Sequence, residues 1–126
     1  YHQNQNGATL TINIACKDAT VENGTLYVYP GTHKEGILPF EPSKSFREDK
    51  GSQPGNLLKL PGKYLDKKTD VLMKKGDMLI LHGNCAHGSY GNTHEFSRPL
   101  FSITYIKKGE YFVVGKNANR TEFPLH

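Results

Sequence analysis

Alternating apolar and polar residues mark the first predicted strand. The stretch Thr9–Ala15 reads TLTINIA, so Leu and Ile alternate with Thr and Asn. Side chains two positions apart lie on the same face of a strand, so this period of two predicts a strand with one apolar and one polar face. A second β-rich run, Thr25–Tyr29, follows Asn23 and Gly24, which together are a strong turn signal.

The second half of the chain adds further short strands. The runs Asp70–Met73, Met78–His82 and Pro99–Ile106 are rich in apolar and β-branched residues. Met78–His82 reads MLILH without interruption, which predicts a strand buried on both faces. Residues 83–92 read as a polar loop. Six or more short strands with Gly-rich turns predict an all-β barrel or sandwich.

Between these two halves, residues 37–68 show no regular period. The stretch is rich in Pro, Gly, Ser and Lys, and its short run Asn56–Leu60 reads as a strand or a tethering turn. A loop this long in a compact domain is usually functional, and strands resume after it. We therefore expect a lid-like insertion in a single domain that spans all 126 residues.

Composition narrows the possible partners. The formal net charge is only +4, and the lysines of the middle region are interleaved with acids. This pattern lacks the dense basic patch with interspersed aromatic residues that nucleic-acid binding requires. No apolar run approaches the roughly 18 residues of a membrane span. The two cysteines form no C-x-x-C pair, which favours reduced thiols and a cytoplasmic location.

Candidate metal ligands lie at the two ends of the chain. His2 and Asn4 are two residues apart and would project from one face of an extended segment. With His87 they would form a facial triad that leaves metal positions open for a 2-oxo acid and oxygen. Arg98 could bind the far carboxylate of that acid through two hydrogen bonds. Taken singly, each residue also fits an ordinary terminal, loop or strand-end role.

Four segments, in order, resemble the phytanoyl-CoA dioxygenase family of iron(II)- and 2-oxoglutarate-dependent oxygenases. Tyr1–Gln5 is similar to the family's aromatic-His-Gln-Asp segment. Asn23–Lys34 is similar to its Asn-Gly-x-Leu-x-x-x-Pro-Gly-Ser-His-Lys signature. Gly76–Asn92 is similar to its Gly-Asp…His-Gly-Ser…Asn segment, and Arg98–Tyr105 to its Arg-x-x-x-Ser-x-x-Tyr strand.

The resemblance implies a double-stranded β-helix, a cupin-like jelly roll, in a member that lacks the family's N-terminal segment. It implies His2 and His87 as iron ligands, with Asn4 where the family has Asp. It implies Arg98 as the 2-oxoglutarate anchor, assisted by Ser102, although a core-facing role for this serine is equally open. An edge left open at the N-terminal side would be covered by a second copy of the chain.

Other residues of these four segments have less direct expected roles. His82 is interpreted as a packing or hydrogen-bonding residue, and Pro30–Lys34 as a structural loop at the cavity rim. Tyr27 and Tyr29 could line the cavity, or they could pack in the core as strand tyrosines commonly do.

The expected function is that of an iron(II)- and 2-oxoglutarate-dependent oxygenase that hydroxylates a small organic substrate, with no nucleic-acid or membrane partner. Two alternatives remain open. Because Asn4 contributes a neutral amide in place of a carboxylate, the protein could be a weak or inactive relative that binds metal or 2-oxo acid. It could also be a jelly-roll module that binds carbohydrate or another ligand.

Overall fold

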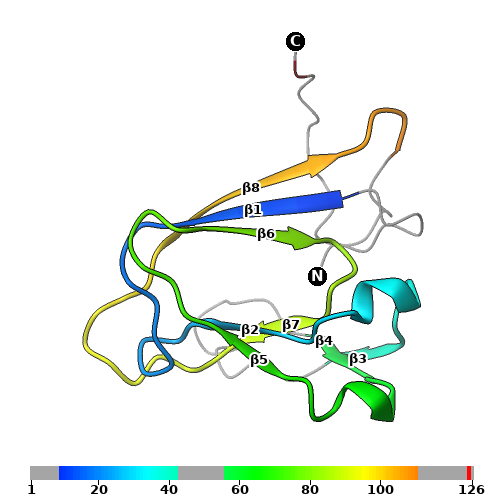
Figure 1. Cartoon of the computed structure of the whole chain (residues 1–126), viewed down its shortest axis with the longest axis horizontal. Coiled ribbons are helices and arrows are strands. Elements are labelled where there is room, and N and C mark those ends of the chain that lie inside the picture. Colours follow the sequence, from blue (N-terminus) through cyan, green and yellow to red (C-terminus); the bar gives the residue numbers. More distant parts are fainter. Residues whose placement is uncertain (1–8, 43–55, 111–124, 126) are drawn as a thin grey trace.

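The computed structural model describes residues 9–42, 56–110 and 125. Two three-stranded antiparallel sheets face each other as two layers (Figure 1). The described part of the chain contains short 3-10 turns but no α-helix. None of its helical segments has the length and apolar character that crossing a bilayer would need.

The first sheet has the strand order β6-β1-β8. The central strand β1 spans Thr9–Ala15, β6 spans Met78–His82, and β8 spans Leu100–Ile106. Both neighbours run antiparallel to β1, and Ile12 lies opposite Ile80 on one side and Ile103 on the other. The sequence prediction of these three strands is confirmed.

The second sheet has the order β5-β2-β7. The strand β2 spans Leu26–Val28 and lies between β5, Thr69–Val71, and β7, His87–Ser89. The prediction that residues 83–92 form only a loop is wrong at β7. The residues His87–Ser89 carry no strand signal of their own. They form a strand because they pair with the central strand β2, where His87 lies opposite Val28.

A two-stranded sheet and two 3-10 turns lie beside the second sheet (Figure 1). Strand β3, Phe40–Pro42, pairs with β4, Asn56–Leu58. The 3-10 turns are η1, Thr32–Glu35, and η3, Gly62–Tyr64, and the Tyr64 hydroxyl donates to Glu35 at 2.7 Å. The middle of the predicted lid, residues 43–55, lies outside the described residues.

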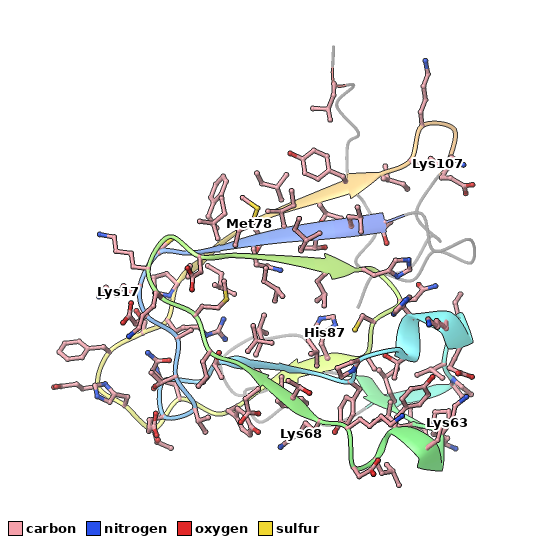
Figure 2. The ribbon with its side chains drawn as sticks, in the orientation of Figure 1. Lys17, Lys63, Lys68, Met78, His87 and Lys107 are labelled. Carbon is pink, nitrogen blue, oxygen red and sulfur yellow. The ribbon has the colours of Figure 1, made fainter. Side chains whose placement is uncertain are left out.

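Strands β1 and β8 of the first sheet turn mostly polar residues inward, and β6 turns Leu81 inward. Leu81 is only 7% exposed, whereas Met78 and Ile80 are 57% and 59% exposed, so the prediction that this strand is buried on both faces is wrong. The cause is the sheet register, because Ile80 and Ile12 lie opposite each other on the outer side. Figure 2 shows Met78 on this side and His87 between the sheets. We call the exposed residues Leu10, Met78, Ile80 and Phe101 the outer apolar face.

The two layers close at one end over a small core. Ala15, Ala19 and Met73 are buried together, and Ala19 pairs with Met73 in an isolated β-bridge. Leu100 packs against this cluster from the start of β8. Paired antiparallel sheets closed in this way confirm the predicted all-β, double-stranded β-helix architecture.

Candidate functional site

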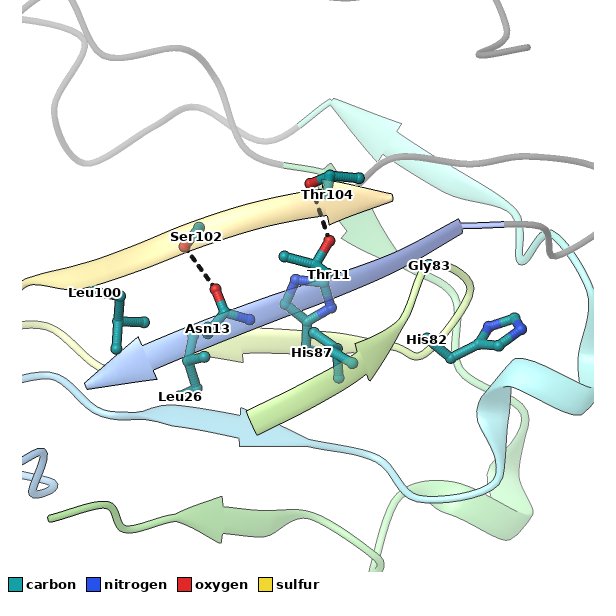
Figure 3. Close-up of a pocket in the computed structure, with 10 residues that line it drawn as sticks. Thr11, Asn13, Leu26, His82, Gly83, His87, Leu100, Ser102 and Thr104 are labelled. Atoms are coloured by element: carbon teal, nitrogen blue, oxygen red, sulfur yellow. Dashed lines mark hydrogen bonds between the residues drawn. The ribbon is translucent and has the colours of Figure 1, made fainter. Parts of the chain in front are cut away.

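A cavity of about 320 Å³ lies between the two sheets (Figure 3). Strands β1, β6, β7 and β8 contribute most of its wall, and β2 contributes one leucine. The lining residues are Thr11, Asn13, Leu26, Leu81, His82, Gly83, His87, Leu100, Ser102 and Thr104.

The wall formed by β1 and β8 is polar but uncharged. The Thr11 and Thr104 hydroxyls lie 3.2 Å apart, and the Ser102 hydroxyl donates to Oδ1 of Asn13 at 2.6 Å. This donation fixes Asn13 with its amide nitrogen turned away from Ser102 and into the cavity (Figure 3). Ser102 therefore lies on the cavity wall, and its predicted role in binding 2-oxoglutarate stays a prediction.

Sequence reasoning did not select Thr11, Asn13 or Thr104. The signal was present in the polar side of the alternating Thr9–Ala15 run. Which side faces inward depends on the register with β6 and β8, and those strands lie far along the chain.

His87 reaches the cavity from β7. Its Nδ1 lies 2.8 Å from the carbonyl oxygen of Cys85. A carbonyl can only accept, so the proton is on Nδ1 and the lone pair is on Nε2, the nitrogen through which such a histidine binds a metal. Burial lowers the pKa of His87, which keeps the imidazole neutral near pH 7. His87 is therefore in the protonation state that metal binding requires.

His82 has the supporting role that was predicted. Its Nδ1 accepts a hydrogen bond from the backbone N–H of Asn84 at 3.1 Å. Its ring contacts that of His33, with 5.2 Å between the ring centroids. His82 thus holds the turn before His87 and links it to η1.

Arg98 lies two residues before Leu100, the first residue of β8. Its Nη2 donates to the carbonyl of Gly24 at 2.6 Å, and its Nε is buried without a hydrogen-bond partner in the structure. Burial lowers the pKa of Arg98, but a guanidinium remains cationic at neutral pH. Arg98 is half-buried and is not among the residues that line the cavity.

The structure brings two predicted site residues, His87 and Ser102, into one cavity. His2 and Asn4, the predicted partners of His87 on the metal, lie outside the described residues. Within the ranges 9–42 and 56–110, no three His, Cys, Asp or Glu side chains gather as a metal site would require.

Tyr27 and Tyr29 are not among the residues that line this cavity, and both are half-buried. Tyr27 contacts Tyr90, with 5.1 Å between ring centroids, and its ring lies over Gly88. Lys68 Nζ lies 5.0 Å from the Tyr27 ring centroid and 4.6 Å from that of Tyr90. These side chains cover the outer side of the second sheet.

Known sequences that are similar to this chain belong to one family. The family model described as Phytanoyl-CoA dioxygenase (PhyH) matches residues 1–100. A phytanoyl-CoA dioxygenase domain-containing protein 1 homolog from Dictyostelium discoideum is 35% identical over 115 residues, which cover 88% of this chain and 39% of that protein. A phytanoyl-CoA dioxygenase from Arabidopsis thaliana is 30% identical over 97 residues, 75% of this chain and 31% of that one.

Solved structures share the fold. The epimerase SnoN, in complex with Fe3+, alpha ketoglutarate and nogalamycin RO, has a TM-score of 0.64 and 21% identity, covering 100% of this chain and 50% of that one. The non-heme monooxygenase ThoJ, in its apo form, has a TM-score of 0.61 and 24% identity, covering 87% and 40%. The chain therefore spans half or less of these proteins.

Proposed function

Because this chain belongs to the phytanoyl-CoA dioxygenase family, we propose that it is an iron(II)- and 2-oxoglutarate-dependent oxygenase that hydroxylates a small organic substrate. The observation that carries the proposal is the state of His87. A neutral imidazole, protonated on Nδ1, faces a cavity whose β1 and β8 wall carries only uncharged hydroxyl and amide groups, those of Thr11, Asn13, Ser102 and Thr104. Such a cavity suits a metal ion that brings its own anionic co-substrate.

The residues of the chain fit this metal as far as they are described. His87 would supply one imidazole through Nε2, and we propose His2 and Asn4 as the further ligands. When bound, iron(II) with 2-oxoglutarate would supply the oxidising chemistry, and the protein would orient the reactants and exclude water. The solved complex of SnoN with Fe3+ and alpha ketoglutarate supports this choice of cofactors.

Arg98 and Ser102 are proposed to bind the co-substrate. The guanidinium would form charge-assisted hydrogen bonds with the carboxylate that is not on the metal. Its present partner, the carbonyl of Gly24, is a neutral acceptor and a weaker one than a carboxylate. The Asn13 amide would present its N–H hydrogen atoms along the β8–β1 wall of the same cavity, and Ser102 would act by holding Asn13 in that orientation through its donation to Oδ1.

The direct test is succinate formation. The purified chain, supplied with iron(II), ascorbate, oxygen and 2-oxoglutarate, is expected to form succinate, and a His87→Ala variant is expected to form none above the protein-free background. Uncoupled turnover makes this test possible without the substrate. Equal succinate from both proteins would contradict the proposal.

Asn4 favours a second candidate, a relative that binds metal or 2-oxo acid with little turnover. An amide oxygen is a weaker, uncharged ligand for a divalent cation than a carboxylate. An Asn4→Asp variant separates the two. If succinate appears only in this variant while both proteins gain thermal stability from metal, the weak-relative reading holds. If the native chain already turns over, it fails.

A further inference from the structure

Thr32 is a buried residue in the signature segment Pro30–Lys34, which the sequence analysis assigned only to the cavity rim. It opens η1, and none of its surface is exposed. The preceding Gly31 has φ of 89°, a left-handed conformation that residues with side chains rarely adopt. This turn brings the Thr32 side chain back toward Tyr29 and Ala86.

The Thr32 hydroxyl makes two short hydrogen bonds of opposite sense, and it lies 3.9 Å from the Cys85 sulfur. It donates to the carbonyl of Tyr29 at 2.7 Å and accepts from the backbone N–H of Ala86 at 2.9 Å. Ala86 is 1% exposed, so water cannot replace this acceptor. Both the donor and the acceptor function of the hydroxyl are therefore used, which fixes its orientation.

The N–H of Ala86 and the C=O of Cys85 belong to one peptide group. That carbonyl accepts the Nδ1–H of His87 at 2.8 Å. Because a peptide group is planar and rigid, fixing its N–H also fixes the direction of its carbonyl. One peptide group thus connects the Thr32 hydroxyl to the His87 imidazole, and hydrogen bonds in such a chain strengthen one another.

We propose that Thr32 is a positioning residue for His87, whose hydroxyl orients the Cys85–Ala86 peptide so that its carbonyl holds the imidazole with the proton on Nδ1 and Nε2 toward the metal. The inference rests on the proposed function for its purpose, because the orientation matters only if His87 binds a metal. Groups that orient a ligating histidine from behind typically change metal affinity 10- to 100-fold when they are removed.

Pairing of the same segment with β2 does not depend on Thr32. The N–H of Tyr29 donates to the carbonyl of Ala86 at 2.9 Å, and Val28 lies opposite His87 in the sheet. A Thr32→Val substitution keeps the side-chain shape and these backbone bonds while removing the hydroxyl. It should release the peptide without unpairing β7.

The experiment compares Thr32→Val with Thr32→Ser, which retains the hydroxyl. The matched control is Thr25→Val, because Thr25 is also fully buried and its hydroxyl donates to a backbone carbonyl, that of Val71. Two readouts are taken. The first is the His87 tautomer in the metal-free protein, from its ¹⁵N chemical shifts, and the second is the dissociation constant for Co²⁺.

We expect the Nδ1–H tautomer in the unsubstituted chain, in Thr32→Ser and in Thr25→Val, and its loss or mixing with the Nε2–H tautomer in Thr32→Val. Co²⁺ affinity should fall about 10-fold or more in Thr32→Val alone. An unchanged tautomer in Thr32→Val, or an equal change in Thr25→Val, would overturn the inference. If the unsubstituted chain binds no Co²⁺, the proposed function fails, and the tautomers still decide the role of Thr32.

Amide exchange in the unsubstituted chain tests the inference without any variant. The Ala86 N–H should exchange far more slowly than that of exposed Gly91. Equal exchange rates would show that the Thr32 hydroxyl does not hold this peptide, and would overturn the proposal.

Discussion

At the scale of single residues, the protein prepares one imidazole for metal binding. Burial and a backbone carbonyl set the charge and the tautomer of His87 before any ion arrives. Its neighbours are fixed in turn, since Asn84 donates to His82 and Ala86 donates to Thr32. A rigid, neutral ligand binds a cation without first losing a proton or changing rotamer.

This state of His87 has a consequence for stability. Its pKa is lowered in the folded protein, so between that value and the usual value of about 6.5 the unfolded chain binds more protons than the folded one. Unfolding free energy should therefore fall as pH drops below about 6.5. Urea titrations of the metal-free chain and of a His87→Gln variant, from pH 8 to 5, measure the effect.

The difference between the two proteins isolates His87, because carboxylates common to both cancel. We expect the unsubstituted chain to lose stability relative to His87→Gln on acidification. A difference that stays constant across this range, or one that grows in favour of the unsubstituted chain, would contradict the assigned burial.

Position 88, next to His87, accepts only glycine because the Tyr27 ring leaves no room for a side chain there. A Cβ at Gly88 would lie 2.4 Å from the Tyr27 hydroxyl and 2.5 Å from Cζ, and Tyr90 and Lys68 hold that ring in place. Gly88→Ala should therefore cost about 1–3 kcal/mol of unfolding free energy. Gly91→Ala, where a Cβ would meet no atom within 4 Å, is the control and should cost less than about 0.5 kcal/mol. Equal losses of unfolding free energy in the two variants would show that the clash with Tyr27 does not cause the destabilisation.

At the scale of elements, β1 and β8 carry most of their polar residues inward, and the first sheet carries much of its apolar surface outward. Asn13 and Ser102 meet across β1 and β8 inside the cavity, while Ile12 and Ile80 meet outside. The polar residues of β1 and β8 offer a charged co-substrate hydrogen-bonding groups that the three leucines of the same cavity lack.

Substitutions of two adjacent residues on β6 test which face of this strand points toward the second sheet. Leu81→Ala removes a side chain that is 7% exposed and should cost about 2–5 kcal/mol of unfolding free energy. Ile80→Ala removes one that is 59% exposed and should cost about 1 kcal/mol or less. Chemical denaturation measures both. A larger cost at Ile80 would show that the assigned register is inverted.

The sequence predicted where the strands lie better than it predicted which of their faces is buried and how they pair. Alternation in Thr9–Ala15 and apolar content in Met78–His82 are local signals, and both strands form with those bounds. The orientation of their faces and the existence of β7 depend on pairing between distant segments, which no local pattern contains. Thr32 was assigned to the rim for the same reason, since its role depends on a contact with Ala86, 54 residues away.

At the scale of the whole molecule, two sheets enclose a cavity to which β1, β7 and β8 each bring a polar group. The predicted metal ligands come from distant parts of the sequence, where residue type and spacing suggest a facial triad and the resemblance to a family adds weight to it. The chain spans 39% of its Dictyostelium discoideum relative and 31% of its Arabidopsis thaliana relative. Within that span lies the cavity on which the proposed chemistry depends.

The most direct test of the central claim is a Mn²⁺ titration followed by NMR, in the presence of 2-oxoglutarate. Paramagnetic broadening should begin at His87, Thr11 and Ser102, should spare Ile80 and Phe101 on the outer apolar face, and should vanish in His87→Ala. Broadening that begins at surface carboxylates such as Asp18, or that persists unchanged in His87→Ala, would contradict a metal site in this cavity.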